Sequence, residues 1–386
     1  MNTRWQAMLP IAAAMIASCA ATGPAPAVLG QNSITPQMLL DSSPLARGVQ
    51  LPVVSREDIL ELTPEMLDFI DEHVDRSQTE YTRLRQLLYA IMGDDHFQLI
   101  YDESTRTAAE TFRKRRGNCL SFTNLFVAMA RNLGIDASYQ EMEIPPDWSL
   151  AGESFLLSKH VNVYLQLRHD ESRIVDFNIY DFSTTYEHHV IPDRRARAHY
   201  YNNIGAESML HGETPGALAN FKASLREDPT FSPAWINLGI LYRREAYPAY
   251  AEAAFMQALT VEPFSLVAMS NLASLYEDQG RTDLAQTYRD RVEVHRMRNP
   301  YYRLFLAREA FASGDYDTSI EHLKHAIRER EGEPRFYSLL SLSYLMEGNR
   351  HEAQRWMEKA EQAAVKKKER EKYSHKLEWL MKQSAQ

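Results

Sequence analysis

The sequence of 386 residues contains two cysteines, and the second stands where a thiol could do chemistry. Cys119 follows Gly117-Asn118 and opens a strongly apolar segment, which predicts a helix that ends near Gly134. A thiol at a helix N-terminus lies at the positive end of the helix dipole, which favours the thiolate. A thiolate can attack an acyl carbon when an imidazole takes up its proton and a carboxylate orients that imidazole. The other interpretation is that Cys119 is a buried, small apolar side chain.

Three short motifs connect Cys119 to a known family. They read Gly117-Asn118-Cys119-Leu120-Ser121-Phe122-Thr123, His160-Val161-Asn162-Val163-Tyr164-Leu165 and Ile174-Val175-Asp176-Phe177-Asn178. Over roughly residues 85 to 190 this pattern resembles the bacterial transglutaminase-like superfamily, in which Cys, His and Asp follow one another on a helix and two neighbouring strands. The resemblance therefore implies a catalytic set of Cys119, His160 and Asp176.

The spacing of the two downstream residues makes a demand on the strand pairing. A tight, symmetric hairpin centred on His169-Asp170 would not place Asp176 directly opposite His160, so we expect an asymmetric turn or a bulge. The oxyanion donors are left open between the backbone N–H of Cys119 and the side chain of Asn118.

The N-terminus has the pattern of a secretory signal peptide, with one positive charge at Arg4, an apolar run and small residues before Cys19. Ile16-Ala17-Ser18-Cys19 resembles a bacterial lipobox, which implies that Cys19 is lipidated and anchors the protein to a membrane. Ala20 resembles the default for transport to the outer membrane. We therefore expect an outer-membrane lipoprotein of the bacterial cell envelope that faces the periplasm; the alternative is an ordinary cleaved signal with an incidental cysteine.

The middle of the chain predicts an α+β domain. Folding should begin near Ser55, helical patterns start near Thr63 and Thr79, and strand patterns follow at 137–143, 160–167 and 173–179. The predicted fold is an α+β papain/transglutaminase-like domain followed by an all-α solenoid. The predicted segments are a signal peptide at 1–18, an anchor and flexible tether at 19–54, the α+β domain at 55–195, the repeat array at 198–365 and a charged capping helix at 366–386.

The second half of the chain repeats itself every 34 residues. Trp235-x-x-Leu238-Gly239-x-x-Tyr242, followed by Ala251, Phe255, Ala258 and Pro263, resembles the tetratricopeptide (TPR) pattern, and about five units can be counted. Such arrays form a groove that binds proteins or peptides. Asn203, Asn237 and Asn271 recur at the same position of three successive units and are candidates for binding a peptide backbone; asparagine is also common there in unliganded repeats.

Charge and ligand patterns exclude several kinds of partner. The formal net charge is -9, with 43 basic and 52 acidic residues and no basic stretch suited to nucleic acid. No cofactor motif is found, and His188-His189 lacks partners at metal-ligand spacing. The basic run 113–116, just before Cys119, either attracts acidic substrates or is a solvated helix face.

Two functions remain in competition. The first is a cysteine-dependent enzyme that attacks an amide or ester, with repeats that recruit a protein substrate. A protease or amidase is preferred to a cross-linker. The second is a catalytically inactive transglutaminase-like scaffold that acts through protein binding. The envelope location would also allow peptidoglycan peptides as substrates, although no residue supports that choice.

Overall fold

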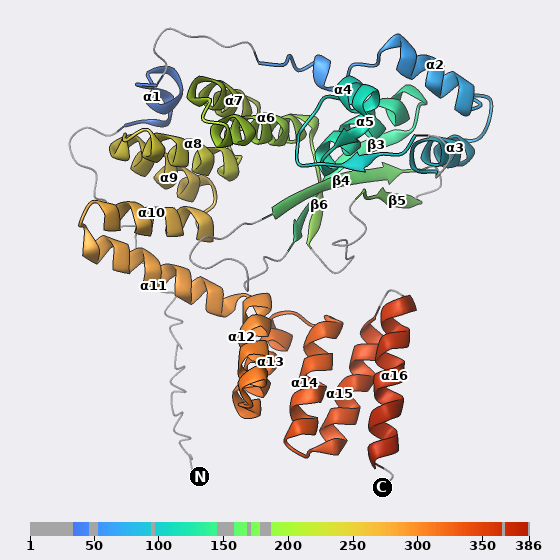
Figure 1. Ribbon diagram of the computed structural model, residues 1–386, viewed down its shortest axis with the longest axis vertical. Helices are drawn as coiled ribbons and strands as arrows, with labels where there is room; N and C mark the ends of the chain where they lie inside the picture. The colour runs from blue at the N-terminus through green and yellow to red at the C-terminus, as the bar shows by residue number, and fades with distance from the viewer. Residues whose placement is uncertain are drawn as a thin grey trace, which may run out of the picture. The chain divides into compact units, whose positions relative to one another are not determined.

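The computed structural model describes residues 34–45, 53–93, 97–144, 158–167, 171–177, 187–364 and 367–384. Its α+β part precedes a run of paired helices, as predicted (Figure 1). The elements of the α+β part are η1 (Asp58–Leu60), α2 (Pro64–His73), α3 (Glu80–Met92), β1 (Ile100–Tyr101), α4 (Ala108–Lys114), β2 (Arg116–Gly117), α5 (Cys119–Asn132), β3 (Asp136–Ile144), β4 (Ser158–Gln166), β5 (Ser172–Val175) and β6 (His188–Ile191).

Local sequence explains where these helices begin. Thr63 accepts a hydrogen bond from the backbone of Met66 and is followed by Pro64, which has no N–H to lose at the first helical position. Helix α4 begins with a capping box in which Thr107 and Glu110 satisfy each other's backbone N–H groups. These signals lie within four residues of one another, so the sequence could predict the entry helices.

The sheet has the order β5-β4-β3-β6, and every neighbouring pair is antiparallel. The three predicted strands are present as β3, β4 and β5. Strand β5 ends at Val175, and residues 178–179 of the predicted third strand lie outside the described residues. Strand β6 was not predicted. Three of its four residues are exposed, so the sequence has no alternation there, and only pairing with β3 makes the segment a strand.

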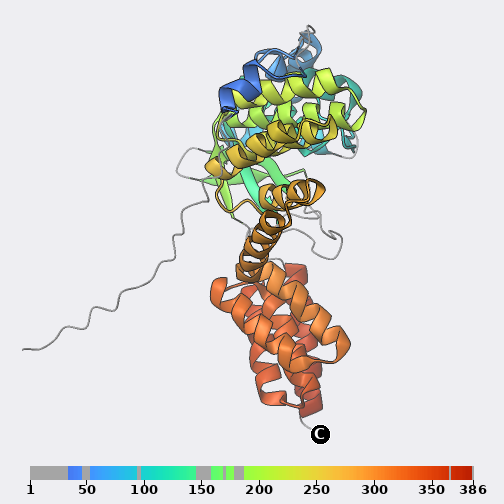
Figure 2. The same ribbon diagram turned by 90° about the vertical axis from the view of Figure 1, so that its left-hand side faces the viewer.

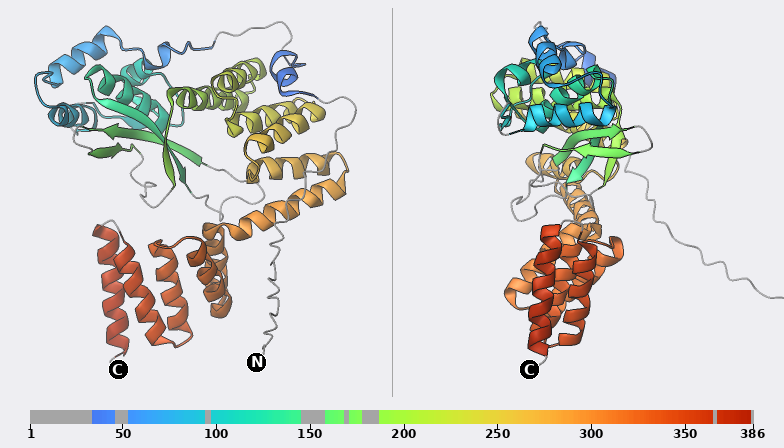
Figure 3. Two further views of the ribbon diagram at one scale, coloured as in Figure 1. Left: turned by 180° about the vertical axis from the view of Figure 1, so that it is seen from behind. Right: turned by 90° about the vertical axis from the view of Figure 1, so that its right-hand side faces the viewer.

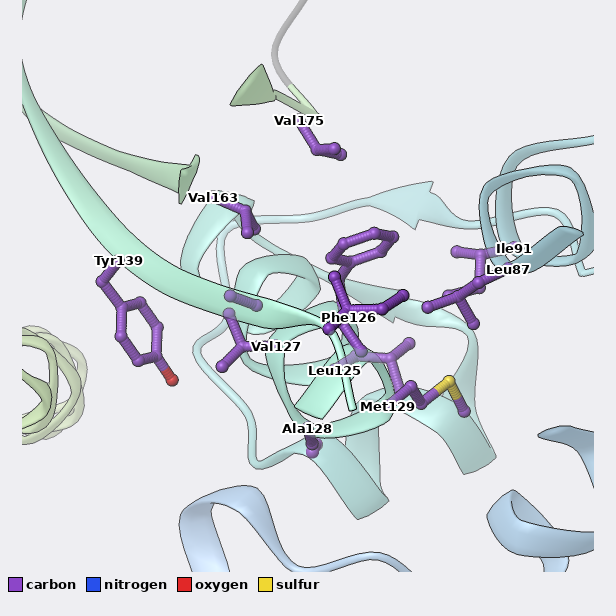
Figure 4. Packing of buried hydrophobic residues seen from close by; sticks show 14 of the residues in the cluster. Leu87, Ile91, Leu125, Phe126, Val127, Ala128, Met129, Tyr139, Val163 and Val175 are labelled. Carbon is purple, nitrogen blue, oxygen red and sulfur yellow. The ribbon is translucent and has the colours of Figure 1, made fainter. Parts of the chain in front are cut away.

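Helix α5 is the centre of the α+β core. Figure 4 shows Leu125, Phe126, Val127, Ala128 and Met129 of this helix between the sheet and α3, and none of these five side chains is more than 5% exposed. A helix that is apolar on nearly all sides must be covered on all sides. Its N-terminal residue is Cys119, so the burial of α5 fixes the position of the nucleophile candidate.

The second half consists of helix pairs with a constant period. Helices α8, α10, α12 and α14 begin at Ser232, Leu266, Pro300 and Pro334, which are 34 residues apart. The bounds of the helices are α6 (Asp193–Leu210), α7 (Thr214–Glu227), α8 (Ser232–Arg244), α9 (Pro248–Val261), α10 (Leu266–Asp278), α11 (Thr282–Arg298), α12 (Pro300–Ser313), α13 (Tyr316–Glu329), α14 (Pro334–Met346), α15 (Arg350–Ala363) and α16 (Lys367–Ser384). The last three, drawn in red, run side by side (Figure 1) and overlap when seen from the side (Figure 2).

Glycine at two positions of the helix pairs has a steric reason. A Cβ atom on Gly239 would lie 2.5 Å from the ring of Phe255, and one on Gly205 would lie 2.6 Å from the ring of Phe221. Glycine therefore lets the two helices of a pair approach closely at these positions. At the turn inside the second pair Ala246 has φ 60°, where the next pair has Gly280 at φ 70°.

The first helix pair belongs to both halves of the protein. Ala196, Tyr200 and Tyr201 pack in the core of the α+β part, whereas Ala198 packs in the core of the repeats. The predicted boundary at 195–198 therefore falls inside one helix. Buried Glu141 of β3 hydrogen-bonds His199 of α6 at 2.8 Å, which ties the sheet to the repeats by a polar contact as well.

The predicted tether at 19–54 is wrong for residues 34–45. Residues Pro36–Asp41 form helix α1, which lies against the repeats beside α9 (Figures 1 and 3). Leu39 is 0% exposed in the repeat core, and its carbonyl accepts a hydrogen bond from Tyr242 Oη at 2.8 Å. The apolar side chains of this Pro- and Ser-rich segment are too few for a periodic pattern, yet they are enough to dock on an existing core.

The two ends of the chain differ in how far the structure describes them. The predicted signal peptide and Cys19 lie outside the described residues. The charged C-terminal stretch forms α16, in which Tyr373 is buried against the preceding pair. Among the helices of the described residues, none is both long enough and apolar enough to cross a membrane.

Candidate functional site

Cys119 is the first residue of α5, and its N-terminal environment is built by Asn118. The Asn118 side-chain oxygen accepts the backbone N–H of Ser121 at 3.0 Å, while its amide group donates to Thr105 Oγ1 at 2.7 Å. Both ends of this side chain therefore cap and hold the helix, so Asn118 is a poor candidate for an oxyanion donor. Cys119 itself is half-buried, which leaves its thiol within reach of a substrate.

Gly117 allows the loop before the nucleophile to lie tightly on the helix. A Cβ atom at Gly117 would stand 2.5 Å from the Cβ of Ser121. The Ser121 hydroxyl in turn accepts the backbone N–H of Arg106 at 2.8 Å and donates to the Ser104 carbonyl at 3.2 Å. The glycine and the serine of the nucleophile motif thus hold the segment 104–106 against the start of α5.

The structure brings His160 and Asp176 into direct contact. His160 Nε2 lies 2.8 Å from Asp176 Oδ1 and 2.9 Å from Oδ2, and both side chains are less than a tenth exposed. Phe177 packs its ring against Phe122 and Phe126 of α5, which fixes the backbone next to Asp176. Two strands and one helix therefore define the position of this carboxylate.

The strand register corrects the expectation of an asymmetric turn or a bulge. Gln166 pairs with Ser172 and Val163 with Val175, so the hairpin is symmetric and Asn162 is the residue opposite Asp176. His160 reaches the carboxylate along the diagonal, which a long side chain can span in an antiparallel pair. The family spacing is satisfied without an inserted residue.

Asn162 is a site residue that the sequence analysis missed. Its amide donates a hydrogen bond to Asp176 Oδ2 at 2.8 Å, and the residue is 0% exposed. It follows His160 by two positions and therefore points to the same face of β4. That alternation is the signal that could have identified it.

The electrostatics of His160 combine two opposing effects. Burial lowers the pKa of its imidazole, but the hydrogen bonds to Asp176 and Cys119 outweigh burial and raise the pKa from 6.5 to about 9. Since Nε2 is occupied by Asp176, Nδ1 is the ring nitrogen that remains for a second partner. The raised pKa means that the charged imidazolium is the form of His160 that this environment favours.

The three repeat asparagines do not form a uniform row of available amides. All three are half-buried. The Asn237 amide donates to Asn202 Oδ1 at 2.9 Å, and the Asn271 amide donates to the Val267 carbonyl of its own helix at 2.9 Å. Only Asn203 makes no side-chain hydrogen bond of its own within the described residues, so peptide binding by this set stays a prediction.

His188 and His189 lie on β6, opposite Met142 and Glu141 of β3. In the described part of the chain, no group of three or more His, Cys, Asp or Glu side chains is arranged to hold a metal ion.

A family comparison identifies the α+β part. The model of the transglutaminase-like superfamily matches residues 68–172. The α+β domain is transglutaminase-like. The match includes Cys119 and His160 and ends four residues before Asp176, which the structure brings back to His160 through the β4–β5 hairpin. A comparison with curated proteins gave no match.

Several solved structures are similar to part of this chain. The MamA protein is 23% identical, with a TM-score of 0.25, over 43% of this chain and 91% of that chain. Pseudomonas aeruginosa pilF is 15% identical, with a TM-score of 0.26, over 49% and 94%. YrrB, a TPR protein with an unusual peptide-binding site, is 17% identical, with a TM-score of 0.24, over 46% and 92%. The chain joins a transglutaminase-like domain to TPR helix pairs, and the evidence for these pairs is the 34-residue spacing of their helices.

Proposed function

We propose that this chain is an envelope lipoprotein whose transglutaminase-like domain is a cysteine-dependent hydrolase or acyltransferase of the protease or amidase type. Its repeats bind the protein substrate or a protein partner. The observation that supports the enzyme is the contact of His160 Nε2 with both oxygens of buried Asp176, in a domain whose helix α5 begins with Cys119. An imidazole that a carboxylate orients is what general acid–base catalysis with a thiol requires.

The proposed reaction begins with the thiol proton on His160 Nδ1. The Cys119 thiolate attacks the acyl carbon, and the backbone N–H of Cys119, at the start of α5, is the proposed donor to the developing oxyanion. His160 then gives its proton to the leaving amine, and a thioester to Cys119 remains. Water or a second amine, deprotonated by His160, attacks the thioester and restores the thiol. Asp176 keeps Nδ1 directed at the sulfur throughout.

Alkylation of Cys119 with iodoacetamide tests this proposal. The protein would be the chain from Ala20 to Gln386, in which Cys119 is the sole thiol. We expect labelling well below pH 8 that becomes slower in His160→Ala and in Asp176→Asn. Cys119→Ala is the matched control and should show no labelling.

The opposite result would favour the inactive scaffold. Labelling of Cys119 only after denaturation, or at a rate that neither substitution changes, would contradict an activated thiol. The repeats would then be the functional part of the protein. Far-ultraviolet circular dichroism of each variant shows whether a lost rate reflects loss of the fold.

The lipid anchor is tested separately in a bacterium that expresses the full chain. Metabolic labelling with an alkyne fatty acid should modify the protein and place it in the outer-membrane fraction. Cys19→Ala should abolish the label, whereas Cys119→Ala should keep it. A soluble periplasmic protein with Cys19 present would contradict the anchor.

A further inference from the structure

Four consecutive cations end three residues before the nucleophile. Arg113 and Lys114 form the end of α4, Arg115 caps it and Arg116 begins β2, and all four side chains are exposed. We call residues 113–116 the basic row. The chain as a whole is acidic, with a formal net charge of -9, so this concentration of positive charge is local.

The basic row is little neutralised by the residues around it. Arg116 lies 3.6 Å from Asp102 Oδ2, and the other oxygen of Asp102 binds Arg106 at 2.7 Å. Across the described ranges no carboxylate forms an ion pair with Arg113, Lys114 or Arg115. One aspartate is therefore shared between Arg116 and Arg106, and the positive charge of the row is left for a ligand.

The backbone at Arg115 adds an independent observation. Arg115 has φ 52° and ψ 31°, the left-handed conformation that glycine would adopt at lower cost at a helix end. Its guanidinium stands 5.1 Å from the centre of the Phe97 ring, so the side chain is held in place. Arg115 is thus fixed in place at the end of α4, and the other three cations of the row are the ones available to a ligand.

The surface next to the row is apolar. Strand β1 pairs in parallel with β2, with Ile100 opposite Arg116 and Tyr101 opposite Gly117. Ile100 is 54% exposed and Tyr101 is 61% exposed. A mixed basic and apolar surface suits an acidic peptide with large side chains better than a small inorganic anion.

The row is close enough to act on a substrate at the thiol. Three residues of fully extended chain span at most about 11 Å, which limits the distance between the Cα atoms of Arg116 and Cys119. The Debye length is about 8 Å in physiological salt, so charges separated by about this distance are only partly screened. At low salt the row should attract an anionic substrate more strongly.

We propose that the basic row selects acyl donors from acidic protein segments and holds them at Cys119. This inference rests on the proposed function, because it assigns a substrate class to the same thiol. The charges attract the carboxylates that flank the scissile bond, while Ile100 and Tyr101 contact the apolar side chains between them. No bond of the reaction changes; the row acts on binding and orientation.

The test compares two alkylating reagents of similar size at Cys119, anionic iodoacetate and neutral iodoacetamide. The variant is Arg113→Gln/Lys114→Gln/Arg116→Gln, which keeps the anchored Arg115. At low salt we expect the ratio of iodoacetate to iodoacetamide rates to fall about threefold in the variant, from Coulomb attraction at about 10 Å. A change in the thiolate fraction affects both reagents equally and cancels in the ratio, and the difference in ratio should vanish in about 0.5 M salt.

The matched control removes three exposed cations from the last helix pairs and the capping helix. Arg308→Gln/Arg328→Gln/Lys372→Gln changes the net charge equally and should leave the ratio as in the unaltered protein. An equal fall in both variants, or no fall in either, would overturn the proposal. If Cys119 resists both reagents, the proposed function fails and this inference fails with it, whereas normal iodoacetamide labelling without anion preference overturns this inference alone.

Protection of Cys119 identifies the ligand class. A synthetic peptide rich in glutamate and phenylalanine should slow iodoacetamide labelling of the unaltered protein and have no effect on the row variant. Protection by a single-stranded oligonucleotide but not by this peptide would contradict the acidic-peptide class.

Discussion

Asp176→Asn should move the titration of His160 across the physiological pH range. The substitution keeps the size of the side chain and removes the negative charge that both imidazole contacts depend on. The imidazole of His160 stays buried in the variant, and burial lowers its pKa. We therefore expect the pKa to fall from about 9 to near or below 6.5, so that the imidazole becomes neutral at pH 7.

The size of the effect follows from the same values. A rise in the pKa of His160 from 6.5 to about 9 corresponds to about 3 kcal/mol in favour of the charged form. Because the folded-state pKa is raised, this stabilisation is fully present below pH 6.5 and is lost as the pH rises through about 9. Both partners are less than a tenth exposed, so solvent screens the contact little.

Nuclear magnetic resonance of ¹³C-histidine-labelled protein measures this titration directly, with His160→Gln to assign the signal. Urea unfolding of the unaltered protein and of Asp176→Asn at several pH values gives the stability difference, which should shrink between pH 6.5 and about 9.5. A His160 pKa that falls by less than about one unit in Asp176→Asn would refute the reasoning, since one unit is about 1.4 kcal/mol.

Four further substitutions test the packing and the site, each by urea unfolding. Leu39→Ala should lower the free energy of unfolding by about 2–5 kcal/mol because Leu39 is fully buried. Met38 is 39% exposed, so Met38→Ala is the control and should have little effect. Gly239→Ala should cost about 1–3 kcal/mol, because the new Cβ meets the ring of Phe255 at 2.5 Å; an unchanged stability would contradict that contact. Ala246→Gly should stabilise the protein by about 1 kcal/mol by relieving φ 60°, and a loss would argue against the left-handed turn. Asn162→Leu should cost about 2 kcal/mol and slow the labelling of Cys119; neither effect would be seen if Asn162 did not hold Asp176.

The sequence by itself determined the features that depend on near neighbours. The caps at Thr63 and Thr107 act within one turn, so the helices that they start could be predicted. The TPR period could be predicted because each repeat packs mainly against the next one. The same contacts therefore need the same residue types every 34 residues. The family resemblance named Cys119, His160 and Asp176, and their roles stay a proposal.

Only the tertiary structure decided the features that join distant segments. The diagonal contact of His160 with Asp176, and the support from Asn162, depend on a strand register that the turn residues did not reveal. Residues 34–45 and β6 have little pattern of their own and take their conformation from the core or strand on which they lie. A short segment contributes too few apolar residues to define its own fold, so its structure is set by surfaces that are remote in sequence.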